Sequence, residues 1–534
     1  MHLIIIISLT LFYFFVSCFD SKRKVKKIAT PLSLTPEERN SDEAKRIKEY
    51  LDTQLKERLG FGIDKEKAIV IARTDQNLLL RAGPGSGKTT TIAYKVFYLM
   101  KKENIKPEQI MTLAFNRDAA KKLRFKIRKD FGLKEFQNTR TFHSLAYQIV
   151  KPKNKILYGK EMFGVIEGII KGIVNDQNEI IDPKIIELFM QWIQRAKKSG
   201  MTFDDIQKEI EINYSGHSTE PFLSLANKTY QRYEDYLSTT NRKDFDDLLK
   251  QATKVVNKTK GKCTISIAKG KKIKINDLKY IFIDEFQDST SLFYNLIYVV
   301  KKYNRNLKLW CVGDANQAIN GFAGSDLKYF DNFSEYFNNT GLADLSINHR
   351  SKKVIVDASN KFMAGEEKQH SCHASPENNK GGEIIIEYAR KDDNGSFLRG
   401  YLELCIEIII SNPNKSIAIL HRKNEIEKMN LFAFHKQLEK KLGNKESKRI
   451  EVSTIHQFKG REKDVVIVLR VCKNIFPIPM HPYNVLFKVF GWSQDAILSE
   501  EKRIFYVGIT RAKEKIYLLT EIENESRYIE ALMK

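Results

Sequence analysis

The sequence predicts an α/β protein with two parallel β-sheets and a helical insertion in the first of them. Short apolar runs that resemble strands alternate with amphipathic segments in two separate parts of the chain, a pattern typical of parallel sheets connected by helices. The region that interrupts the first of these parts has helical periodicity and no strand-like runs. A glycine-rich loop follows the first apolar run, at the end of a strand where such sheets bind ligands.

An apolar run at residues 3–19 precedes this pattern. It is just long enough for a marginal membrane span or for the core of a signal peptide. The basic segment 22–27 follows it, and by the positive-inside rule this flank keeps the remaining chain in the cytoplasm. A membrane anchor, an export signal and a start codon assigned too far upstream are the three interpretations, and we disfavour export. We therefore separate residues 1–20 from a polar leader, 21–60, with a helix expected near residues 41–59.

The first α/β domain is expected at residues 61–150 and 246–340, on either side of the insertion. The insertion, residues 151–245, is rich in Lys, Glu, Ile and aromatic residues. Alternation returns in residues 341–534, which we expect to form a second α/β domain. The apolar runs predict strands at 77–81, 109–115, 279–283 and 307–312 in the first domain, and at 383–388, 416–420, 465–470 and 515–519 in the second.

Composition narrows the class of partner. The 534 residues include 90 Lys and Arg against 66 Asp and Glu, a net charge of +24. Such an excess indicates a polyanionic partner, either nucleic acid or an anionic membrane. Compositional drift is the alternative, because Lys, Ile and Asn are abundant together. The six cysteines contain no CxxC pair, which excludes a disulfide scaffold and fits a reducing compartment.

The glycine-rich loop, residues 82–89, reads Ala-Gly-Pro-Gly-Ser-Gly-Lys-Thr. Its small residues let backbone N–H groups point at a phosphate, and the following helix adds its positive end. Lys88 would neutralise the β- and γ-phosphates, and the Thr89 hydroxyl would bind Mg²⁺. A chance glycine-rich turn is the alternative. The residues predicted to hold the nucleotide here are Ala82, Gly83, Pro84, Gly85, Ser86, Gly87, Lys88, Thr89 and Thr90.

Two adjacent carboxylates, Asp284 and Glu285, follow the apolar run 279–283. Asp284 would hold Mg²⁺ through water, and Glu285 would accept a proton from the attacking water. A solvated acidic turn after a core strand is the alternative, and the phosphate loop disfavours it. Together the two sites predict an ATP-hydrolysing centre that uses ATP and Mg²⁺.

Eight short motifs follow one another along the chain. They are Ala-Phe-Asn-Arg at 114–117, Thr-Phe-His-Ser at 141–144, Asp-Phe-Asp-Asp-Leu at 244–248, Asp-Glu-Phe-Gln-Asp at 284–288, Gly-Asp-Ala-Asn-Gln at 313–317, Asn-His-Arg-Ser at 348–351, Thr-Ile-His-Gln-Phe-Lys-Gly-Arg-Glu at 454–462 and Tyr-Val-Gly-Ile-Thr-Arg-Ala at 506–512. With these motifs, from about residue 61 to 520, the chain resembles the UvrD/Rep/PcrA-like superfamily 1 DNA helicases.

The resemblance implies two RecA-like domains of the P-loop NTPase type with ATP between them. Gln317 would orient the attacking water or sense the γ-phosphate. Arg350 and Arg511 would reach across from the second domain as arginine fingers. His349 would cover the base, and Glu462 would approach the ribose. The implied activity is 3′-to-5′ movement along DNA in the cytoplasm, with roles in DNA repair, recombination or replication.

The resemblance also implies single-stranded or tailed duplex DNA as the partner. Phe115 and Phe322 would stack on bases, which tolerates any sequence because every base has a π-face. An ordinary core position is the alternative for each aromatic residue. The predicted DNA-contacting residues are Phe115, Asn116, Arg117, Thr141, His143, Phe322, Thr454 and His456.

Several positions depart from the family pattern. Lys67 stands where the family usually has Gln, and lysine lacks the acceptor needed to read adenine. His349 stands in place of Tyr, so purine selectivity is expected to be relaxed. Asn320 and Ala323 replace Tyr and Arg, which removes one stacking platform and one cation. We therefore expect intact ATP hydrolysis and less certain unwinding. A nucleotide-gated DNA-binding or scaffold protein that unwinds poorly is the alternative function.

The second domain is also expected to be compact. Full-size relatives carry a large helical subdomain before the motif at 454–462. Here only residues 423–450 fill that place, which is roughly one helix and a turn. Membrane contact through the N-terminal run and the identity of protein partners stay open.

Overall fold

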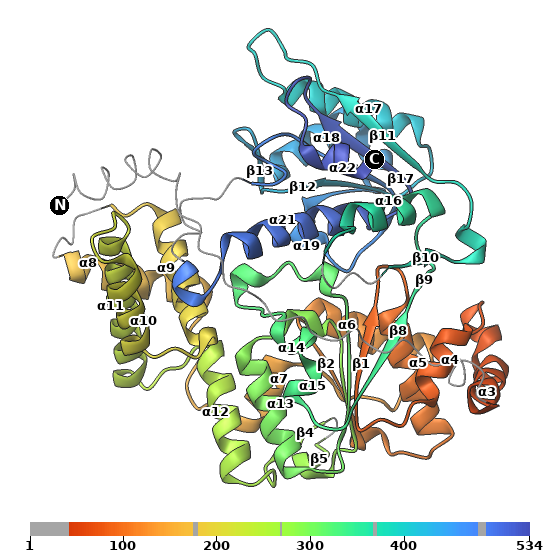
Figure 1. The fold of residues 1–534 in the computed structure, drawn as a ribbon, viewed down its shortest axis with the longest axis vertical. Helices are drawn as coiled ribbons and strands as arrows, with labels where there is room; N and C mark the ends of the chain where they lie inside the picture. Colours follow the sequence, from red (N-terminus) through yellow and green to blue (C-terminus); the bar gives the residue numbers. More distant parts are fainter. Residues whose placement is uncertain (1–41, 175–179, 268–269, 367–370, 479–486, 534) are drawn as a thin grey trace.

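The computed structural model describes residues 42–174, 180–267, 270–366, 371–478 and 487–533. Two parallel sheets lie one above the other, each covered by helices on both faces, and a helical insertion stands beside the lower domain (Figure 1). The α/β prediction with two parallel sheets is confirmed. The apolar run at 3–19 and its basic flank lie outside the described residues. In the described ranges no helix combines the length and apolarity that a membrane crossing requires.

The first sheet has the strand order β3-β2-β6-β7-β1-β8, and every pair is parallel. The four expected strands are present, and β3 and β8 were not foreseen. β8 is an edge strand whose residues alternate between buried and half-buried, so it shows no apolar run. The strands are β1 (Asn77–Ala82), β2 (Ile110–Ala114), β3 (Thr139–Thr141), β6 (Tyr280–Ile283), β7 (Lys308–Gly313) and β8 (Thr340–Leu345).

The position of β8 corrects the expected boundary between the domains at residues 340 and 341. β8 pairs with β1 along its length, and Arg81 forms two hydrogen bonds of 2.7 and 2.8 Å with the Asp344 carboxylate. The first domain therefore continues through Leu345. A separate two-stranded pair, β9 (Ile347–Asn348) with β10 (His373–Ala374), follows this connection.

Helices cover both faces of the first sheet, and the side chains of its strands alternate between the two cores that result. Leu78 and Leu80 face one core, and Leu79 faces the other, because successive side chains of a strand point to opposite faces. The first core contains α3 (Asp42–Leu59), α4 (Lys65–Ala72), α5 (Lys88–Lys101) and α6 (Arg117–Phe125); the second contains α7 (Phe142–Val150), α12 (Phe245–Lys258) and α13 (Ser291–Tyr303), with the short α14 (Lys328–Asp331) and α15 (Phe333–Tyr336) at its end.

Helix α3 matches the helix expected near residues 41–59, but it does not belong to a separate leader. Ile47, Leu51 and Leu55 are almost fully buried and pack in the first core. Their spacing of four residues places them on one helical face. The first domain therefore includes α3 and does not begin at residue 61.

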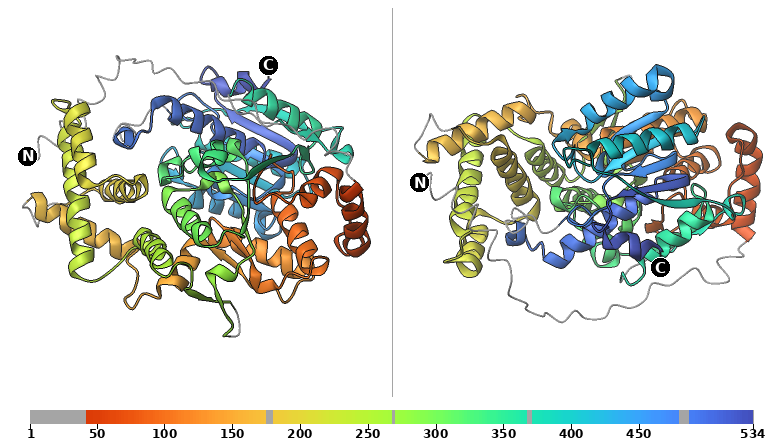
Figure 2. Two further views of the ribbon diagram at one scale, coloured as in Figure 1. Left: turned by 60° about the horizontal axis from the view of Figure 1, so that its bottom comes forward. Right: turned by 90° about the horizontal axis from the view of Figure 1, so that it is seen from above.

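The insertion is helical, as the composition of 151–245 predicts. Its four helices enclose a core of their own around Trp192, and they stand apart from both sheets in the two turned views (Figure 2). Phe487 and Val489 of the second domain also pack in this core. The helices are α8 (Gly159–Val174), α9 (Pro183–Ser199), α10 (Phe203–Tyr214) and α11 (Glu220–Thr239).

One buried lysine ties the insertion to the first domain. The Lys197 ammonium on α9 lies 2.6 Å from Asp244, 2.8 Å from Asp247 and 2.6 Å from Glu234. Asp244 also caps α12 by accepting from the backbone N–H of Asp247 at 2.9 Å. The motif at 244–248 therefore joins the insertion to the sheet.

The second sheet is also parallel throughout, with the order β11-β17-β16-β12-β15. Its four expected strands are present, and the edge strand β15 was not foreseen. The strands are β11 (Glu383–Tyr388), β12 (Ile417–His421), β15 (Ile450–Thr454), β16 (Lys463–Val468) and β17 (Ala512–Thr520), and the helices are α16 (Lys353–Met363), α17 (Leu398–Ser411), α18 (Leu431–Ser447), α19 (Ile455–Phe458), α21 (Gln494–Ile509) and α22 (Arg527–Met533).

Between β12 and β15 the chain forms only a small hairpin and α18. The hairpin pairs β13 (Glu425–Ile426) with β14 (Met429–Asn430), and α18 packs back on the second domain through Phe434 and Leu438. Among the described residues of the segment 423–450, no large subdomain is present.

Candidate nucleotide site and nucleic-acid interface

The phosphate loop joins the end of β1 to the start of α5. Gly85 and Gly87 have φ angles of +70° and +85°, a backbone conformation that favours glycine. A Cβ atom on Gly85 would lie 2.3 Å from Asn348 Oδ1, so this residue must also be small. Lys88 Nζ donates to the carbonyl oxygen of Ala82 at 2.9 Å. Its charge therefore lies over the loop, beside the N-terminal end of α5.

The first turn of α5 keeps its backbone N–H groups available. Gly87 is the N-cap and has no side chain to accept from them. Ser86, which lies just before it, donates instead to the carbonyl oxygen of Gly83 at 2.8 Å and so closes the loop. A phosphate group fits such a turn, because the free N–H groups and the helix dipole both favour an anion.

Asp284 and Glu285 lie at the carboxyl end of β6, beside the phosphate loop. The Thr89 hydroxyl donates to Asp284 Oδ2 at 2.9 Å. Burial and the neighbouring charge of Glu285 together raise the pKa of Asp284 to about 7. Burial also raises the pKa of Glu285, but Lys88 and Lys459 outweigh it, and that pKa lies below its ordinary value. Glu285 is therefore the carboxylate that stays ionised.

A path of hydrogen bonds connects the second domain to Glu285. Arg511 Nη2 donates to Gln317 Oε1 at 3.1 Å, and Gln317 Nε2 donates to Asp314 Oδ2 at 2.6 Å. The backbone N–H of Asp314 donates to Gln287 Oε1 at 3.0 Å, and Gln287 Nε2 donates to Glu285 Oε2 at 2.6 Å. Each of these five residues except Glu285 is almost fully buried. Two predicted catalytic residues, Gln317 and Arg511, are thus in direct contact.

Arg350 approaches the same site from the segment after β9. Its Nη1 donates to the carbonyl oxygen of Thr510 at 3.0 Å, and its Nε donates to the carboxylate of Glu462. Burial, together with the neighbouring charge of Arg350, lowers the pKa of Arg511 to about 9. A Cβ atom on Gly85 would lie 2.7 Å from the Cβ of Arg350, so Arg350 lies against the phosphate loop.

Lys67, His349 and Asp64 form a polar cluster where the sequence departs from the family. Lys67 Nζ lies 3.1 Å from His349 Nε2, which in turn lies 3.1 Å from Asp64 Oδ2, and Lys67 forms an ion pair with Asp64. A Cβ atom on Gly87 would lie 3.0 Å from Lys67 Cε. Lys67 and His349 are therefore adjacent to each other and to the phosphate loop.

Sequence reasoning missed an ion pair that crosses the domain boundary. Lys459 Nζ of the second domain lies 2.9 and 2.7 Å from the two carboxylate oxygens of Asp288 in the first domain. Both side chains are largely buried. Each residue belongs to a motif that the sequence displays, but nothing in the two motifs shows that they meet. The sequence shows only the order of the two motifs along the chain.

Four of the predicted DNA-contacting residues lie in two clusters of rings. Phe115 and His143, at the carboxyl ends of β2 and β3, each pack against the ring of Phe293, at 6.0 and 5.6 Å. Phe322 of the first domain contacts His456 of the second, with ring centroids 5.6 Å apart. The Phe322 side chain is 40% exposed, whereas Phe115 is partly buried.

Three predicted DNA-contacting side chains cap helices. The backbone N–H groups of Ala119, Ser144 and Gln457 donate to the side-chain oxygens of Asn116, Thr141 and Thr454, at 2.8, 3.1 and 3.3 Å. A capping hydroxyl still has its own O–H to donate, so the two threonines remain able to bind a phosphate. Asn116 is followed by Arg117, which is exposed.

Both histidines of the interface are uncharged at neutral pH. Burial, together with the charge of Lys198, lowers the pKa of His143 to about 4. Burial lowers the pKa of His456 to about 3, together with the charges of Arg422 and Lys459. These rings can therefore donate one hydrogen bond, but they do not neutralise a phosphate.

The loop that contains Asn320 and Ala323 is held by cations from the insertion. Lys198 Nζ donates to the carbonyl oxygen of Ala323 at 2.9 Å, and Arg195 Nη1 donates to the carbonyl oxygen of Gly321. The N–H of Gly321 donates to Glu500 of the second domain at 3.1 Å. The insertion and both α/β domains therefore meet at this loop.

Comparisons with known proteins agree with this arrangement. The family model described as the UvrD/REP helicase N-terminal domain matches residues 63–338, and the one described as the UvrD-like helicase C-terminal domain matches residues 423–522. The first match covers the nucleotide loop, both carboxylates and the insertion. The second covers Lys459, Glu462 and Arg511.

Three curated proteins illustrate the similarity. A probable DNA helicase II homolog from Mycoplasma capricolum is 26% identical over 76% of this chain and 53% of its own length. DNA helicase IV of Escherichia coli is 24% identical over 88% of this chain and 70% of its own. The ATP-dependent DNA helicase PcrA of Staphylococcus epidermidis is 26% identical over 68% and 48%. The chain thus spans about half the length of the first and third of these relatives.

Proposed function

Because the chain belongs to the UvrD/REP helicase family, we propose that it is an ATP-dependent DNA helicase that moves 3′-to-5′ along single-stranded DNA. The observation that carries this proposal is the hydrogen-bonded path from Arg511 to Glu285. It joins a cation of one domain to the carboxylate of the other that would activate water. A movement between the domains would therefore alter the hydrogen bonds that lead to Glu285. Such a connection is what the coupling of ATP hydrolysis to movement requires.

The first domain would bind the nucleotide. Lys88 and the free N–H groups at the start of α5 would hold the phosphates. The Thr89 hydroxyl and the Asp284 carboxylate, 2.9 Å apart, form an oxygen pair of the kind that Mg²⁺ prefers. Bound Mg²⁺ would neutralise charge on the phosphates. Glu285, which stays ionised, would accept the proton of the attacking water.

The second domain would complete the site. Arg511 and Arg350 would place guanidinium groups beside the transferred phosphoryl group, where their planar donors stabilise the charge of the transition state. Glu462 would leave Arg350 and approach the ribose. Lys459, in its ion pair with Asp288, would hold the two domains closed.

The two DNA clusters would lie on the path of the strand. Phe115 and His143 belong to the first domain alone, whereas Phe322 and His456 meet across the boundary between the domains. Opening that boundary after hydrolysis would change one cluster and leave the other intact. We infer that this difference lets one cluster grip the strand while the other releases it. The substrate would be single-stranded or tailed duplex DNA.

A direct test measures ATP hydrolysis by the full chain with and without single-stranded DNA. We expect stimulation by DNA in the wild type and none in Lys88→Ala. Lys102→Ala, an exposed position just after α5, is the matched control and should behave as the wild type. Absence of stimulation in the wild type contradicts the proposal.

The loop at Asn320 and Ala323 favours a second function. Its contacts with Arg195, Lys198 and Glu500 hold it in place, and it lacks the Tyr and Arg of the family pattern. A nucleotide-gated DNA-binding or scaffold protein would show ATP-dependent affinity for DNA. It would not displace the strand of a 3′-tailed duplex, whereas a helicase would.

A further inference from the structure

One segment of the chain carries much of its positive charge and has no part in the proposed site. Residues 250–279 contain ten lysines and a single acidic residue, Asp277. Their net charge of +9 is more than a third of the +24 of the whole chain. None of the motifs that indicate nucleotide or single-strand binding falls in this segment.

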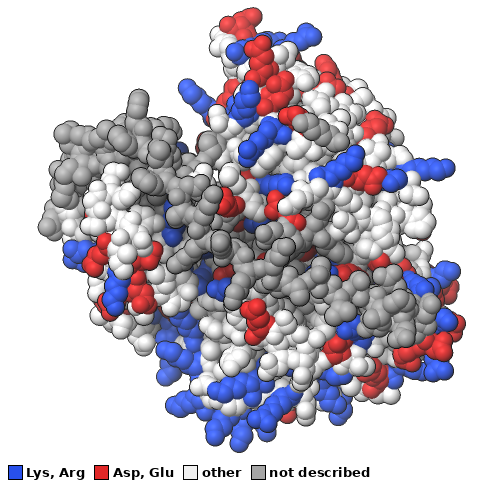
Figure 3. All heavy atoms as spheres, viewed as in Figure 1, with Lys and Arg blue, Asp and Glu red and all other residues white. Residues whose placement is uncertain are grey.

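The fold gathers these lysines on one surface. The segment forms the end of α12, the antiparallel hairpin of β4 (Thr264–Ser266) and β5 (Lys272–Lys274), and the approach to β6. Lys and Arg side chains crowd the lower end of the molecule, where Figure 1 places these elements, with few carboxylates among them (Figure 3). Eight lysines of residues 250–279 are exposed, and we call them the basic surface: Lys254, Lys258, Lys260, Lys262, Lys271, Lys272, Lys274 and Lys279.

The charges of the basic surface are almost all unneutralised. Lys271 lies 2.6 Å from Glu108. In the part of the chain that the structure describes, no other lysine of the basic surface forms an ion pair with a carboxylate. Like charges held this close repel one another, and an approaching polyanion relieves the repulsion.

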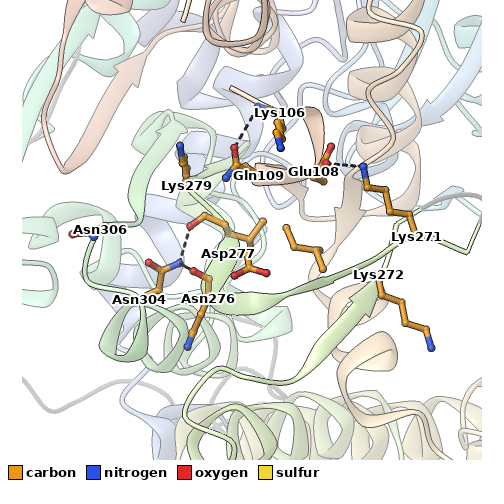
Figure 4. A pocket seen from close by; sticks show the side chains of 12 residues that line it. Lys106, Glu108, Gln109, Lys271, Lys272, Asn276, Asp277, Lys279, Asn304 and Asn306 are labelled. Carbon is orange, nitrogen blue, oxygen red and sulfur yellow. Dashed lines mark hydrogen bonds and ion pairs between the residues drawn. The ribbon is translucent and has the colours of Figure 1, made fainter. Parts of the chain in front are cut away.

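A hollow of about 500 Å³ lies within the basic surface. Lys106, Lys271, Lys272 and Lys279 line it, and Figure 4 shows them around Asp277. The hollow is formed where the chain enters β2, β6 and β7, which is the opposite edge of the parallel sheet from the phosphate loop. The basic surface is therefore separate from the nucleotide site and from both DNA clusters.

The residue types indicate what kind of polyanion fits. Residues 250–279 contain no Phe, Tyr or Trp, so the segment offers no platform for stacking unpaired bases. It also exposes no large apolar side chain in its described part, although the core of a protein interface needs them. Lysines spread over a surface match the phosphates of a double helix, which are fixed in position and present one charge for about every 1.7 Å of helix axis.

We propose that the basic surface binds the phosphate backbone of duplex DNA. The inference rests on the proposed function, because the duplex would be the double-stranded part of a tailed substrate. Binding there would hold the duplex against the first domain while the single strand lies on the opposite edge of the sheet. Since lysines contact phosphates and not base edges, the binding would be independent of sequence.

The test replaces five exposed lysines of the basic surface: Lys254→Gln, Lys258→Gln, Lys262→Gln, Lys272→Gln and Lys274→Gln. The affinity of the full chain for a blunt duplex is measured without nucleotide at several salt concentrations. We expect the affinity to fall at least tenfold, and the slope of log K against log salt to become shallower by about 0.9 for each phosphate that is no longer neutralised. Stimulation of ATP hydrolysis by single-stranded oligothymidine should be unchanged, which separates this inference from the proposed function.

The matched control neutralises five exposed lysines of the second domain: Lys428, Lys436, Lys440, Lys441 and Lys448, each changed to Gln. It loses the same charge and should keep its affinity for duplex. Equal losses of affinity in the two variants would overturn the inference, as would an unchanged affinity in the first. Tighter binding of polyglutamate than of duplex by the wild type would also overturn it, in favour of an acidic protein partner.

Discussion

The two sheets share one architecture and differ in what their strands deliver. Both are parallel throughout and are covered by helices on both faces. The first sheet places a phosphate loop and two carboxylates at its carboxyl edge. The second places two cations near the same site, Lys459 and Arg511, and its described residues form no phosphate loop there. The site thus divides into a half that would bind the nucleotide and a half that would respond to it.

This division has an electrostatic basis. Glu285 is partly buried in the first domain, and Lys88 of its own domain and Lys459 of the other lower its pKa and favour its ionised form. Arg511 is buried beside it, next to Arg350. Each half therefore depends on the charge of the other. Substitutions on the two sides should therefore separate nucleotide binding from the response to it.

Arg511→Ala removes a fully buried cation that the second domain contributes to the site. We expect the rate of ATP hydrolysis to fall roughly 10³–10⁵-fold, because an arginine finger has this effect on phosphoryl transfer. Nucleotide binding, measured with a fluorescent ATP analogue, should change little. Arg511→Lys keeps the charge without the planar fork and should recover only part of the rate. An Arg511→Ala protein with normal turnover would assign the residue to the core alone.

Glu285→Gln tests the carboxylate of the first domain. The amide cannot accept the proton of the attacking water, so we expect turnover to fall roughly 10²–10⁴-fold. The variant should still bind ATP and close the domains, and its affinity for single-stranded DNA in the presence of ATP should therefore remain. Loss of ATP binding in parallel with turnover would show that Glu285 only maintains the fold of the site.

Lys459→Met breaks the ion pair that crosses the domain boundary. Asp288 would be left buried and unpaired, at a cost of about 3 kcal/mol to the closed arrangement. We expect weaker coupling, seen as a reduced stimulation of ATP hydrolysis by DNA, with less effect on the basal rate. Adding Asp288→Asn removes the uncompensated charge and should restore part of the coupling in a double-mutant cycle. Strictly additive effects would contradict a direct interaction.

Lys67→Gln restores the residue that the family usually has at this position beside the phosphate loop. In the wild type we expect GTP to be hydrolysed within about tenfold of ATP, because lysine has no acceptor with which to read adenine. The amide supplies one acceptor and one donor, so the variant should favour ATP by about a further tenfold. The measurement compares the rates at which the wild type and the variant hydrolyse ATP, GTP, CTP and UTP. A wild type already selective for ATP would mean that other groups read the base.

The sequence was informative where chemistry demands particular residues in a short segment. The phosphate loop, the two carboxylates and the buried central strands can be recognised because glycine, charge and apolar runs are local signals. Edge strands such as β8 and β15 could not be recognised, since they are only half apolar. The sequence of helix α3 shows one apolar face, Ile47, Leu51 and Leu55, but not that this face packs on α4 in the core of the first domain.

The amino-acid sequence by itself determined the two parallel sheets, the helical insertion and the inventory of charged and aromatic residues. Only the tertiary structure decided which of them meet. Lys459 reaches Asp288, Arg511 reaches Gln317, and the lysines of residues 250–279 form one surface away from the nucleotide. The physical reason is that local propensity and spacing act over a few residues, whereas charge pairing and burial depend on which distant segments the packed core brings together.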